Sequence, residues 1–543
     1  MSTAGTGTTL LINLTRFGDL LQSQPLIDEI HHKGNRVHLL CLENFSSALP
    51  LLRHVEQAWP LPGARFMADM DKNWRTAVSN LLDITRTIRK QSCPNCVINL
   101  TTTLPARLLA GLLCEDITRI RGFCLDREGF GRNNGIWASF LNGTTASRLS
   151  APFNIVDMFR MLGNPDSSGD TAHLPRFRLA PPLPKAMVKA DTLLANAPAG
   201  TRGYVCMQLG ASETRRQWPA HSFATVGDRL WQELRLCPVL LGSTAEAPLA
   251  RAYMASTHAP CIDTIGKTDL ESLAALLIRS RLLITNDTGT MHLAAGLGVT
   301  CLAIFLATAQ PCDTGPYLPD CCCLEPALSC HPCQFNTPCT NNLECVSYIR
   351  PQVVSELALT RLTRSTWDTA CLTSIENEAR IWLTDQDAQG FAFVRRLTAL
   401  PPDDRSLWLL HQRIFWRQLL DTMNGHSYPT HTHCEQVRPM VTAYSDAFVE
   451  RMVTALTQAS HLFALLTEQG HLIGKSAMVG QLFLRNCDRV QNVLDDCPEL
   501  RSLGGFWREL RHERGDRIDD LLAITDLLEQ HIGNWRNLFK NGT

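Results

Sequence analysis

Short apolar runs alternate with helical patterns in two separate series along this chain, and this alternation limits its possible folds most strongly. In the first series, residues 9–14 (TLLINL) form an apolar run. The residues after it recur at helical spacing: Leu20, Leu21, Leu26, Ile27 and Ile30. Further apolar runs occupy residues 36–41 and 95–100, each followed by a helical pattern. This order is typical of a parallel sheet built from βαβ units.

A proline-rich stretch at residues 174–185 separates the two series. Its prolines, at positions 175, 181, 182 and 184, exclude a helix interior or a central strand. The second series has apolar runs at residues 204–209, 238–241, 282–285 and 300–305. We therefore predict an α/β fold with two Rossmann-like domains that face a cleft, over residues 1–180 and 181–365.

After about Arg364 the strand signals stop and amphipathic helical patterns continue to the C-terminus. Two apolar faces illustrate this: Phe448, Met452, Ala455, Ala459 and Phe463, and Ile518, Leu521, Thr525, Leu528 and Ile532. Residues 366–543 are predicted to form an all-α extension. Nothing in its sequence indicates chemistry, and our hypothesis for it is oligomerisation or partner docking.

Length and composition narrow the class of protein. A chain of 543 residues is too long for one core. With 45% hydrophobic residues, 19% charged residues and a net charge of −1, it is typical of a globular protein with no field for binding nucleic acid. We see no secretory signal at its start, no membrane-spanning run, and 21 scattered cysteines that suit reduced thiols. These features predict a cytoplasmic protein.

The first loop with a chemical signal is Arg16-Phe17-Gly18-Asp19, between the first strand and the first helix. Gly18 permits a tight turn and a close approach by a ligand. Asp19 is a candidate catalytic carboxylate, and capping of the helix is the alternative interpretation.

The second loop, residues 209–219, places small residues beside Arg215 and Arg216 before a helix that starts near Pro219. Backbone N–H groups and guanidinium groups together suit a diphosphate. A solvated turn is the alternative.

The third loop is the most informative, because the strand 282–285 leads directly into Asn286-Asp287-Thr288-Gly289 and then a helix. Thr288 and Gly289 would present backbone donors at the helix N-terminus, where negative charge on a ligand is favoured. His292 follows about one turn later. A histidine satisfied within the core is the alternative, which its spacing from Asp287 makes less favoured.

Together these motifs resemble glycosyltransferase family 9, the heptosyltransferases of lipopolysaccharide core assembly. The resemblance covers residues 8–350, and includes GKTDLESL at 266–273 and TGPY at 314–317. Where the family reads G-P-T, this chain reads Leu306-Ala307-Thr308. The resemblance implies a GT-B fold and an inverting mechanism.

The resemblance also implies roles for individual residues. Asp19 matches the general base, and Arg216 stands where the family has a phosphate-binding lysine. The donor-binding set would be Ser212, Arg216, Glu246 (at the nucleoside ribose), Asp287, Thr288, Gly289 and His292. The acceptor side would include Arg16, Gly18 and Arg107, the last of which follows a position near Pro105 where the family has a basic residue.

The implied reaction transfers a sugar, a heptose by resemblance, from a nucleotide-diphosphate donor such as ADP-heptose. The acceptor would be a lipopolysaccharide core or another cell-surface glycan, reached with at most peripheral contact to the inner membrane. No cofactor is required. Two alternatives are a protein glycosyltransferase of the same family and a non-catalytic nucleotide-sugar-binding scaffold. An NAD-dependent oxidoreductase is disfavoured because no G-x-G-x-x-G follows the first strand.

Cysteines crowd one loop, with Cys330, Cys333, Cys339 and Cys345 close in sequence. Four thiols are compatible with structural Zn or Fe, and reduced structural thiols are the alternative. A second cluster contains His426, His431, His433, Cys434 and Glu435. It lacks a neighbouring catalytic motif, so a metal there is disfavoured.

Overall fold

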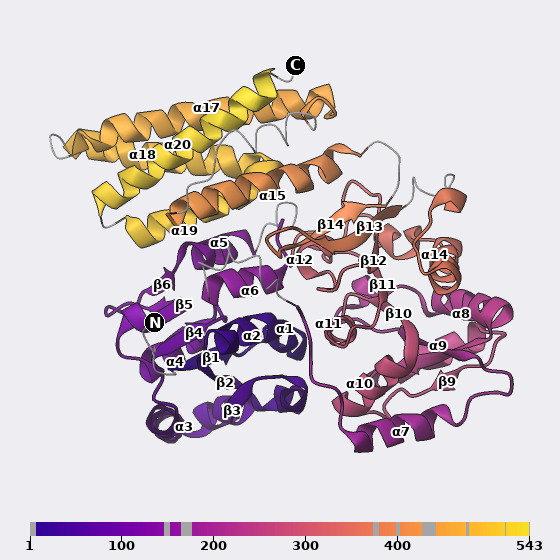
Figure 1. Ribbon diagram of the computed structural model, residues 1–543. Helices are drawn as coiled ribbons and strands as arrows, with labels where there is room; N and C mark the ends of the chain where they lie inside the picture. The colour runs from indigo at the N-terminus through magenta and orange to yellow at the C-terminus, as the bar shows by residue number, and fades with distance from the viewer. Residues whose placement is uncertain are drawn as a thin grey trace. The chain divides into compact units, whose positions relative to one another are not determined.

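The computed structural model describes residues 7–145, 152–163, 176–372, 379–397, 402–425, 441–473, 477–515 and 517–541 (Figure 1). Its contacts group the chain into two compact units. The first contains residues 1–129 and 153–399, and the second contains residues 130–152 and 400–543. Both predicted sheets belong to the first unit. The predicted ranges 1–180, 181–365 and 366–543 therefore differ from these units.

The first sheet is parallel, and its strands within this unit run in the order β3-β2-β1-β4-β5. Strand order reverses on either side of β1, which creates a crevice at the carboxyl ends of β1 and β4. The strands are β1 (Thr8–Asn13), β2 (Arg36–Leu42), β3 (Val55–Leu61), β4 (Cys96–Asn99) and β5 (Ile120–Leu125). The helices are α1 (Phe17–Gln22), α2 (Gln24–His32), η1 (Glu43–Leu51), α3 (Gly63–Ser92), α4 (Leu104–Leu113), η2 (Ile117–Arg119) and α6 (Ile155–Gly163).

The second sheet has the order β14-β13-β12-β11-β10-β7-β8-β9. Its strands are β7 (Gly203–Gln208), β8 (Leu236–Leu241), β9 (Ile262–Asp263), β10 (Ser280–Asn286), β11 (Cys301–Ile304), β12 (Cys322–Pro326), β13 (Ala379–Gln386) and β14 (Ala392–Arg396). Strands β7 to β12 pair in parallel, and strand order reverses between β7 and β10. The second crevice is therefore expected beyond the carboxyl ends of β7 and β10.

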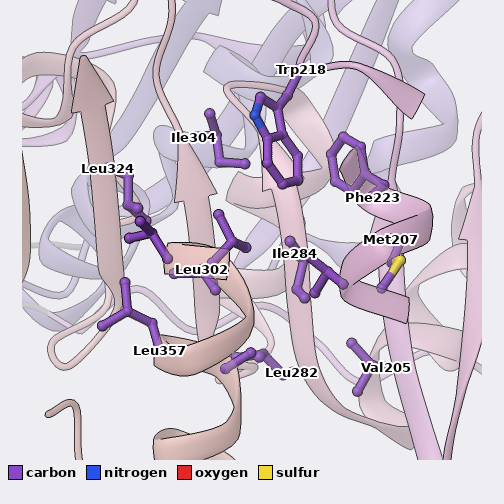
Figure 2. Packing of buried hydrophobic residues seen from close by; sticks show 14 of the residues in the cluster. Val205, Met207, Trp218, Phe223, Leu282, Ile284, Leu302, Ile304, Leu324 and Leu357 are labelled. Carbon is purple, nitrogen blue, oxygen red and sulfur yellow. The ribbon is translucent and has the colours of Figure 1, made fainter. Parts of the chain in front are cut away.

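Helices pack against this second sheet and bury its apolar side chains (Figure 2). Trp218 is central: its ring lies 4.9 Å from that of Phe223, and its Nε1 donates to the carbonyl of Ile349 at 3.0 Å. The helices are α7 (Pro184–Leu194), η6 (Thr214–Arg216), α8 (Ala220–Leu234), η7 (Thr244–Glu246), α9 (Ala247–Ser256), α10 (Leu270–Arg279), α11 (Gly289–Gly296), α12 (Pro311–Thr314), α13 (Glu344–Tyr348), α14 (Pro351–Arg364) and η8 (Ala370–Leu372).

The expectation of helices alone after residue 365 is wrong for residues 379–396. Strand β13 pairs antiparallel with β12, and β14 pairs antiparallel with β13, so both extend the second sheet. The first six residues of β13 are buried, among them Ile381, Trp382 and Leu383, because the strand lies between β12 and β14, a pairing that the sequence alone does not reveal. The C-terminal helical region is present but begins at Asp404.

The second unit is mainly helical. It contains β6 (Gly131–Asn134), α5 (Ile136–Thr144), α15 (Asp404–Met423), α17 (Asp446–Gly470), α18 (Ala477–Asp496), η10 (Pro498–Leu500), α19 (Arg501–Arg514) and α20 (Ile518–Asn541). Helix α5 packs closely on α19, since a Cβ on Gly143 would lie 2.8 Å from the carbonyl carbon of Gly505. Phe140 of α5 contacts Trp416 at 4.8 Å between ring centroids. Both apolar faces predicted for α17 and α20 are buried, except at Ile518, which is half-buried.

Within the described ranges, none of the helices combines the length and the apolar character needed to cross a bilayer.

Candidate functional site

Asn286, the last residue of β10, joins the loops that follow β7 and β10. Its Nδ2 donates to the carbonyl of Leu209 at 2.9 Å and to that of Gly210 at 3.2 Å, while its Oδ1 accepts from the backbone N–H of Trp218 at 3.0 Å. The side chain is fully buried. One residue therefore holds both predicted donor loops at the crevice of the second sheet.

The guanidinium of Arg216 is the principal positive group at this crevice. Its side chain is 12% exposed, and its Nη1 lies 3.5 Å from Oδ2 of Asp287. Nη2 donates to the hydroxyl of Thr308 and lies 3.6 Å from the carboxylate of Glu213. Nε is buried and has no hydrogen-bond partner among the described residues. Arg216 is thus oriented by protein groups and keeps a donor for an anion.

Helix α11 starts at the same crevice. Thr288 is its N-cap residue with extended backbone (φ −147°, ψ 163°), and no side chain caps the helix. The Thr288 hydroxyl lies 3.3 Å from that of Thr285. An uncapped helix N-terminus carries unsatisfied N–H groups and partial positive charge, which favour a phosphate or a sugar oxygen.

The N-terminal ends of α1 and α11 meet, which brings the predicted first and third loops together. A Cβ on Gly18 would lie 3.3 Å from both Cα of Gly289 and Cδ2 of His292. A Cβ on Gly289 would lie 2.2 Å from Cζ of Phe17. A Cβ at position 289 would therefore collide with the Phe17 ring, and one at position 18 would fit only after a small shift of its neighbours. The first sheet supplies Asp19 and the second supplies Thr288 to His292 at one place.

Asp19 lies in the first turn of α1, and a side chain from the end of strand β1 holds its backbone in place. Nδ2 of Asn13 donates to the Asp19 carbonyl at 3.1 Å. Burial raises the pKa of the Asp19 carboxyl above its usual range, and the backbone N–H and charge of Arg16 and the hydroxyl of Thr15 oppose the rise only in part. A half-buried carboxylate with a raised pKa is a stronger base than an exposed one.

His292 is buried, and burial lowers its pKa to about 4. The ring is therefore neutral at neutral pH, and its Nδ1 has no hydrogen-bond partner among the described residues. A neutral imidazole with an unused nitrogen suits a ligand hydroxyl better than a phosphate.

The Glu246 side chain packs against Gly210 and Gly242, beside the loop after β7. Its Oε2 accepts from the N–H of Ser243 at 2.6 Å and from the Ser243 hydroxyl at 2.9 Å. Its Oε1 accepts from Nε2 of Gln208 at 3.1 Å. A Cβ on Gly210 would lie 1.4 Å from Oε1, so only glycine leaves room for this carboxylate.

The remaining predicted site residues, Ser212, Arg16 and Arg107, differ in their burial. Ser212 and Arg16 are exposed. Arg107 is buried, with Nε donating to the carbonyl of Thr102 at 2.8 Å and Nη1 to that of Cys124 at 3.1 Å. These bonds connect the loop after β4 to the end of β5.

The predicted metal site is not formed. Cys330 and Cys339 are exposed, Cys333 is half-buried and Cys345 is buried, all as free thiols. Burial, together with the neighbouring thiols of the same loop, raises the pKa of Cys333 and of Cys345. Over the described part of the chain, no three His, Cys, Asp or Glu side chains are arranged to hold a metal ion. The cluster at residues 426–435 lies outside the described residues.

Three further residues belong to the site but were not singled out from the sequence: Gln208, Thr290 and Thr308. Oε1 of Gln208 accepts from the Thr290 hydroxyl at 3.1 Å, and its Nε2 donates to Glu246. Thr308 contacts Arg216. The threonine retained in Leu306-Ala307-Thr308 could have indicated the last one, while Gln208 looks like an ordinary strand end.

The family model "Glycosyltransferase family 9 (heptosyltransferase)" matches residues 174–343. Lipopolysaccharide heptosyltransferase 2 of Escherichia coli (strain K12) is 26% identical over 139 residues, which are 22% of this chain and 37% of that protein. The match thus spans just over a third of that relative's length.

Two solved structures are also similar. The E. coli ADP-heptose lps heptosyltransferase II structure is 16% identical and covers 66% of this chain and 100% of its own, with a TM-score of 0.48. A glycosyltransferase family 9 structure from Veillonella parvula DSM 2008 is 18% identical and covers 57% of this chain and 83% of its own, with a TM-score of 0.46. Residues 174–343, which carry the second and third loops, therefore match glycosyltransferase family 9.

Proposed function

We propose that this protein is an inverting glycosyltransferase that moves a sugar, a heptose, from a nucleoside diphosphate to a lipopolysaccharide core or another cell-surface glycan. One observation carries the proposal: the start of α1, with Asp19, meets the start of α11, with its free N–H groups and His292. The candidate base follows a strand of the first sheet, and the anion-binding helix end follows a strand of the second sheet. The two therefore lie next to each other.

On the donor side, the diphosphate would lie between Arg216 and the N-terminus of α11. The guanidinium and the helix dipole stabilise the negative charge that grows on the leaving diphosphate as the bond to the anomeric carbon breaks. Glu246 would accept hydrogen bonds from the nucleoside ribose. His292, neutral and buried, would contact a sugar hydroxyl.

On the acceptor side, Asp19 would take the proton of the acceptor hydroxyl while that oxygen attacks the anomeric carbon. The attacking oxygen and the leaving phosphate oxygen lie on opposite faces of the carbon, so its configuration inverts. The electron pair of the broken bond goes to the diphosphate, and the proton stays on the Asp19 carboxyl until solvent removes it.

A panel of nucleotide sugars that includes ADP-heptose tests the proposal directly. Binding is measured by calorimetry, and donor turnover by release of the nucleoside diphosphate, for the wild type and Asp19→Ala. Binding of one donor by both proteins, with turnover by the wild type alone, is expected. Binding without turnover on any glycan acceptor would favour a nucleotide-sugar-binding scaffold, and no binding would overturn both.

Arg216→Gln is expected to weaken donor binding about tenfold to hundredfold, the size of a lost hydrogen bond to a charged group. Arg216→Lys keeps the positive charge but loses the paired N–H donors of the guanidinium, so its donor Kd should lie between those of the wild type and Arg216→Gln. Donor Kd is measured by calorimetry. Arg251→Gln, an exposed position on α9, is the matched control and should bind donor as the wild type does. Equal Kd values for Arg216→Gln and wild type would remove Arg216 from the donor site.

The acceptor proposal includes a membrane surface, because the expected acceptor is lipid-linked and the reaction would take place in the cytoplasm. Helix α3 exposes large apolar side chains along the first half of its length: Met67 (69%), Met70 (44%), Trp74 (55%) and Val78 (37%). Arg65, Lys72 and Arg75 are exposed on the same segment and outnumber its two acidic residues, Asp69 and Asp71, by one. Arg75 also stacks on Trp74 at 5.0 Å. Tryptophan with neighbouring basic residues suits the interface of an anionic bilayer.

Trp74→Glu is expected to weaken binding to vesicles of phosphatidylglycerol and phosphatidylethanolamine about tenfold or more, since it removes a large apolar group from the bilayer. Co-sedimentation measures the bound fraction. Val188→Glu, which changes an equally exposed apolar residue on α7, should bind as the wild type does. Equal loss in both variants would show that α3 is not the contact surface.

A further inference from the structure

A cavity of about 470 Å³ lies at the other end of α11 from the donor site. Its walls come from the linker before α7, the C-terminal end of α11 at Gly296 to Gly298, the turn at residues 317–319, and Arg53. Because α11 has eight residues, its two ends are about 12 Å apart. The cavity is therefore separate from the crevice that holds Arg216.

The linker strand fixes two arginines at this cavity. Burial alternates along residues 176–179, with Phe177 and Leu179 buried and Arg176 and Arg178 exposed. The buried pair packs on α11, since a Cβ on Gly296 would lie 2.6 Å from Leu179 and 3.0 Å from Phe177. The N–H of Leu179 also donates to the Gly296 carbonyl at 2.8 Å. Arg176 and Arg178 consequently point away from the packed face.

Arg53 joins the cluster from the first sheet's side of the cavity. The N–H of Ala180 donates to the carbonyl of Leu51 at 2.8 Å, which places the linker beside the segment that carries Arg53. Gln24 fixes Arg53 at both backbone groups, accepting from its N–H at 2.7 Å and donating to its carbonyl at 3.2 Å. Three guanidinium groups thus line one cavity on well-fixed backbone.

The charges at this cavity are not balanced. Among the described residues, none of Arg53, Arg176 and Arg178 makes an ion pair within 4.0 Å. The carbonyls of Gly296, Ala295 and Ala294 at the end of α11 each accept an N–H, from Leu179, Gly298 and Val299, which reduces the negative charge at this helix end. Asp28 acts electrostatically on Arg53 from beyond ion-pair distance and offsets part of its charge. Three like charges at one cavity still repel each other, and a bound polyanion would relieve that repulsion.

We propose that this cavity is a binding site for a small polyanion that carries two or more phosphate groups. The volume is enough for a ligand of nucleotide size or smaller. Guanidinium forks from Arg53 on one wall and Arg176 and Arg178 on the other hold its phosphate oxygens. Since the linker connects the two sheets of the first unit, a bound polyanion also fixes the linker on α11.

Calorimetric titration with tripolyphosphate tests the site, in a background of Arg216→Gln so that the donor crevice contributes least. We expect saturable binding that weakens about tenfold in Arg178→Gln and further in Arg53→Gln/Arg178→Gln. Arg251→Gln in the same background is the matched control and should leave the Kd unchanged. Inorganic phosphate should bind more weakly than tripolyphosphate.

Thermal unfolding separates loss of binding from loss of folding. Without ligand, the double variant should unfold at the same temperature as its background or a higher one, because repulsion is relieved. Tripolyphosphate should raise the unfolding temperature of the background protein and not that of the double variant. An equal rise in both, or an unchanged Kd in the double variant, would overturn the proposal. Glycan acceptors with and without phosphate groups, titrated in parallel, distinguish a phosphorylated acceptor from a free polyphosphate as the source of the ligand.

Discussion

Asp19→Asn is expected to lower the turnover number about 10²- to 10⁴-fold while the Kd of the donor stays within about twofold. The amide has nearly the shape of the carboxylate but accepts no proton, so the acceptor hydroxyl would attack without a base. The donor contacts come from the second sheet, at Arg216 and the start of α11, and are untouched. Single-turnover release of the nucleoside diphosphate measures the chemical step.

The matched control is Asp191→Asn, which changes an exposed aspartate on α7 that pairs with Arg279. It should leave turnover unchanged. If Asp19→Asn retained wild-type turnover, the base would have to be another group, and the contact between α1 and α11 would lose its proposed meaning.

The pH dependence of the same reaction follows from the raised pKa of Asp19. The base must be ionised to act, so kcat/KM should rise with pH through the pKa of Asp19 in the free enzyme and then level off. Because burial raises that pKa, the midpoint of the rise should lie above the ordinary aspartate value of about 3.9. Asp19→Asn should remove this limb of the profile.

The free energy of unfolding should fall with rising pH over the range in which kcat/KM rises. A carboxyl whose pKa is higher in the folded than in the unfolded protein holds more protons when folded, so stability falls as pH rises between the two pKa values. At pH values above both pKa values, the buried charge of Asp19 lowers the free energy of unfolding. Asp19→Asn should therefore unfold at a higher temperature than the wild type at neutral pH, a gain in stability with a loss of activity.

Asp157→Ala is expected to lower the free energy of unfolding by about 3–5 kcal/mol, the usual result of breaking a buried ion pair from one side. Asp157 is fully buried in α6. It accepts from the Tyr317 hydroxyl at 2.7 Å, the N–H of Ala392 at 2.8 Å and Nη1 of Arg160 at 2.9 Å, among other interactions. Removing the carboxylate leaves a buried guanidinium with one acidic partner, Glu29. Urea unfolding followed by tryptophan fluorescence measures the loss.

Two further variants serve as comparisons for Asp157→Ala. Asp157→Asn keeps the shape and one acceptor oxygen, so its loss should be smaller, about 1.5–3 kcal/mol. Asp191→Ala breaks a pair with Arg279 in which both side chains are about half exposed, and should cost less than about 1 kcal/mol. Similar losses for Asp157→Ala and Asp191→Ala would contradict the importance of the buried network.

Much of the fold follows from local patterns in the sequence. The apolar runs at residues 9–14, 204–209 and 282–285 become β1, β7 and β10 because a strand buried on both faces needs a continuous apolar run. The donor loops were predictable because the carboxyl ends of parallel strands are where ligands bind. Asp287, Thr288 and Gly289 stand there as expected.

What the sequence did not reveal depends on contacts between distant segments. β13 forms a strand because it pairs with β12, and α5 groups with the C-terminal helices because Gly143 meets Gly505. The roles of Gln208 and Thr308 likewise come from partners far along the chain, at Glu246, Thr290 and Arg216. The cysteine loop brings its thiols near one another, but among the described residues they are not arranged to hold a metal ion, so the alternative of reduced thiols fits better.

The side chain of Gln208 makes two features of the donor interdependent. It holds the carboxylate proposed for the nucleoside with one end and the helix proposed for the sugar with the other. A substitution at Glu246 that alters nucleotide preference would release or turn this amide, and Thr290 at the start of α11 would feel the change. Nucleotide and sugar preference would therefore tend to change together during evolution, and an engineer who wants to alter one alone should first replace Gln208.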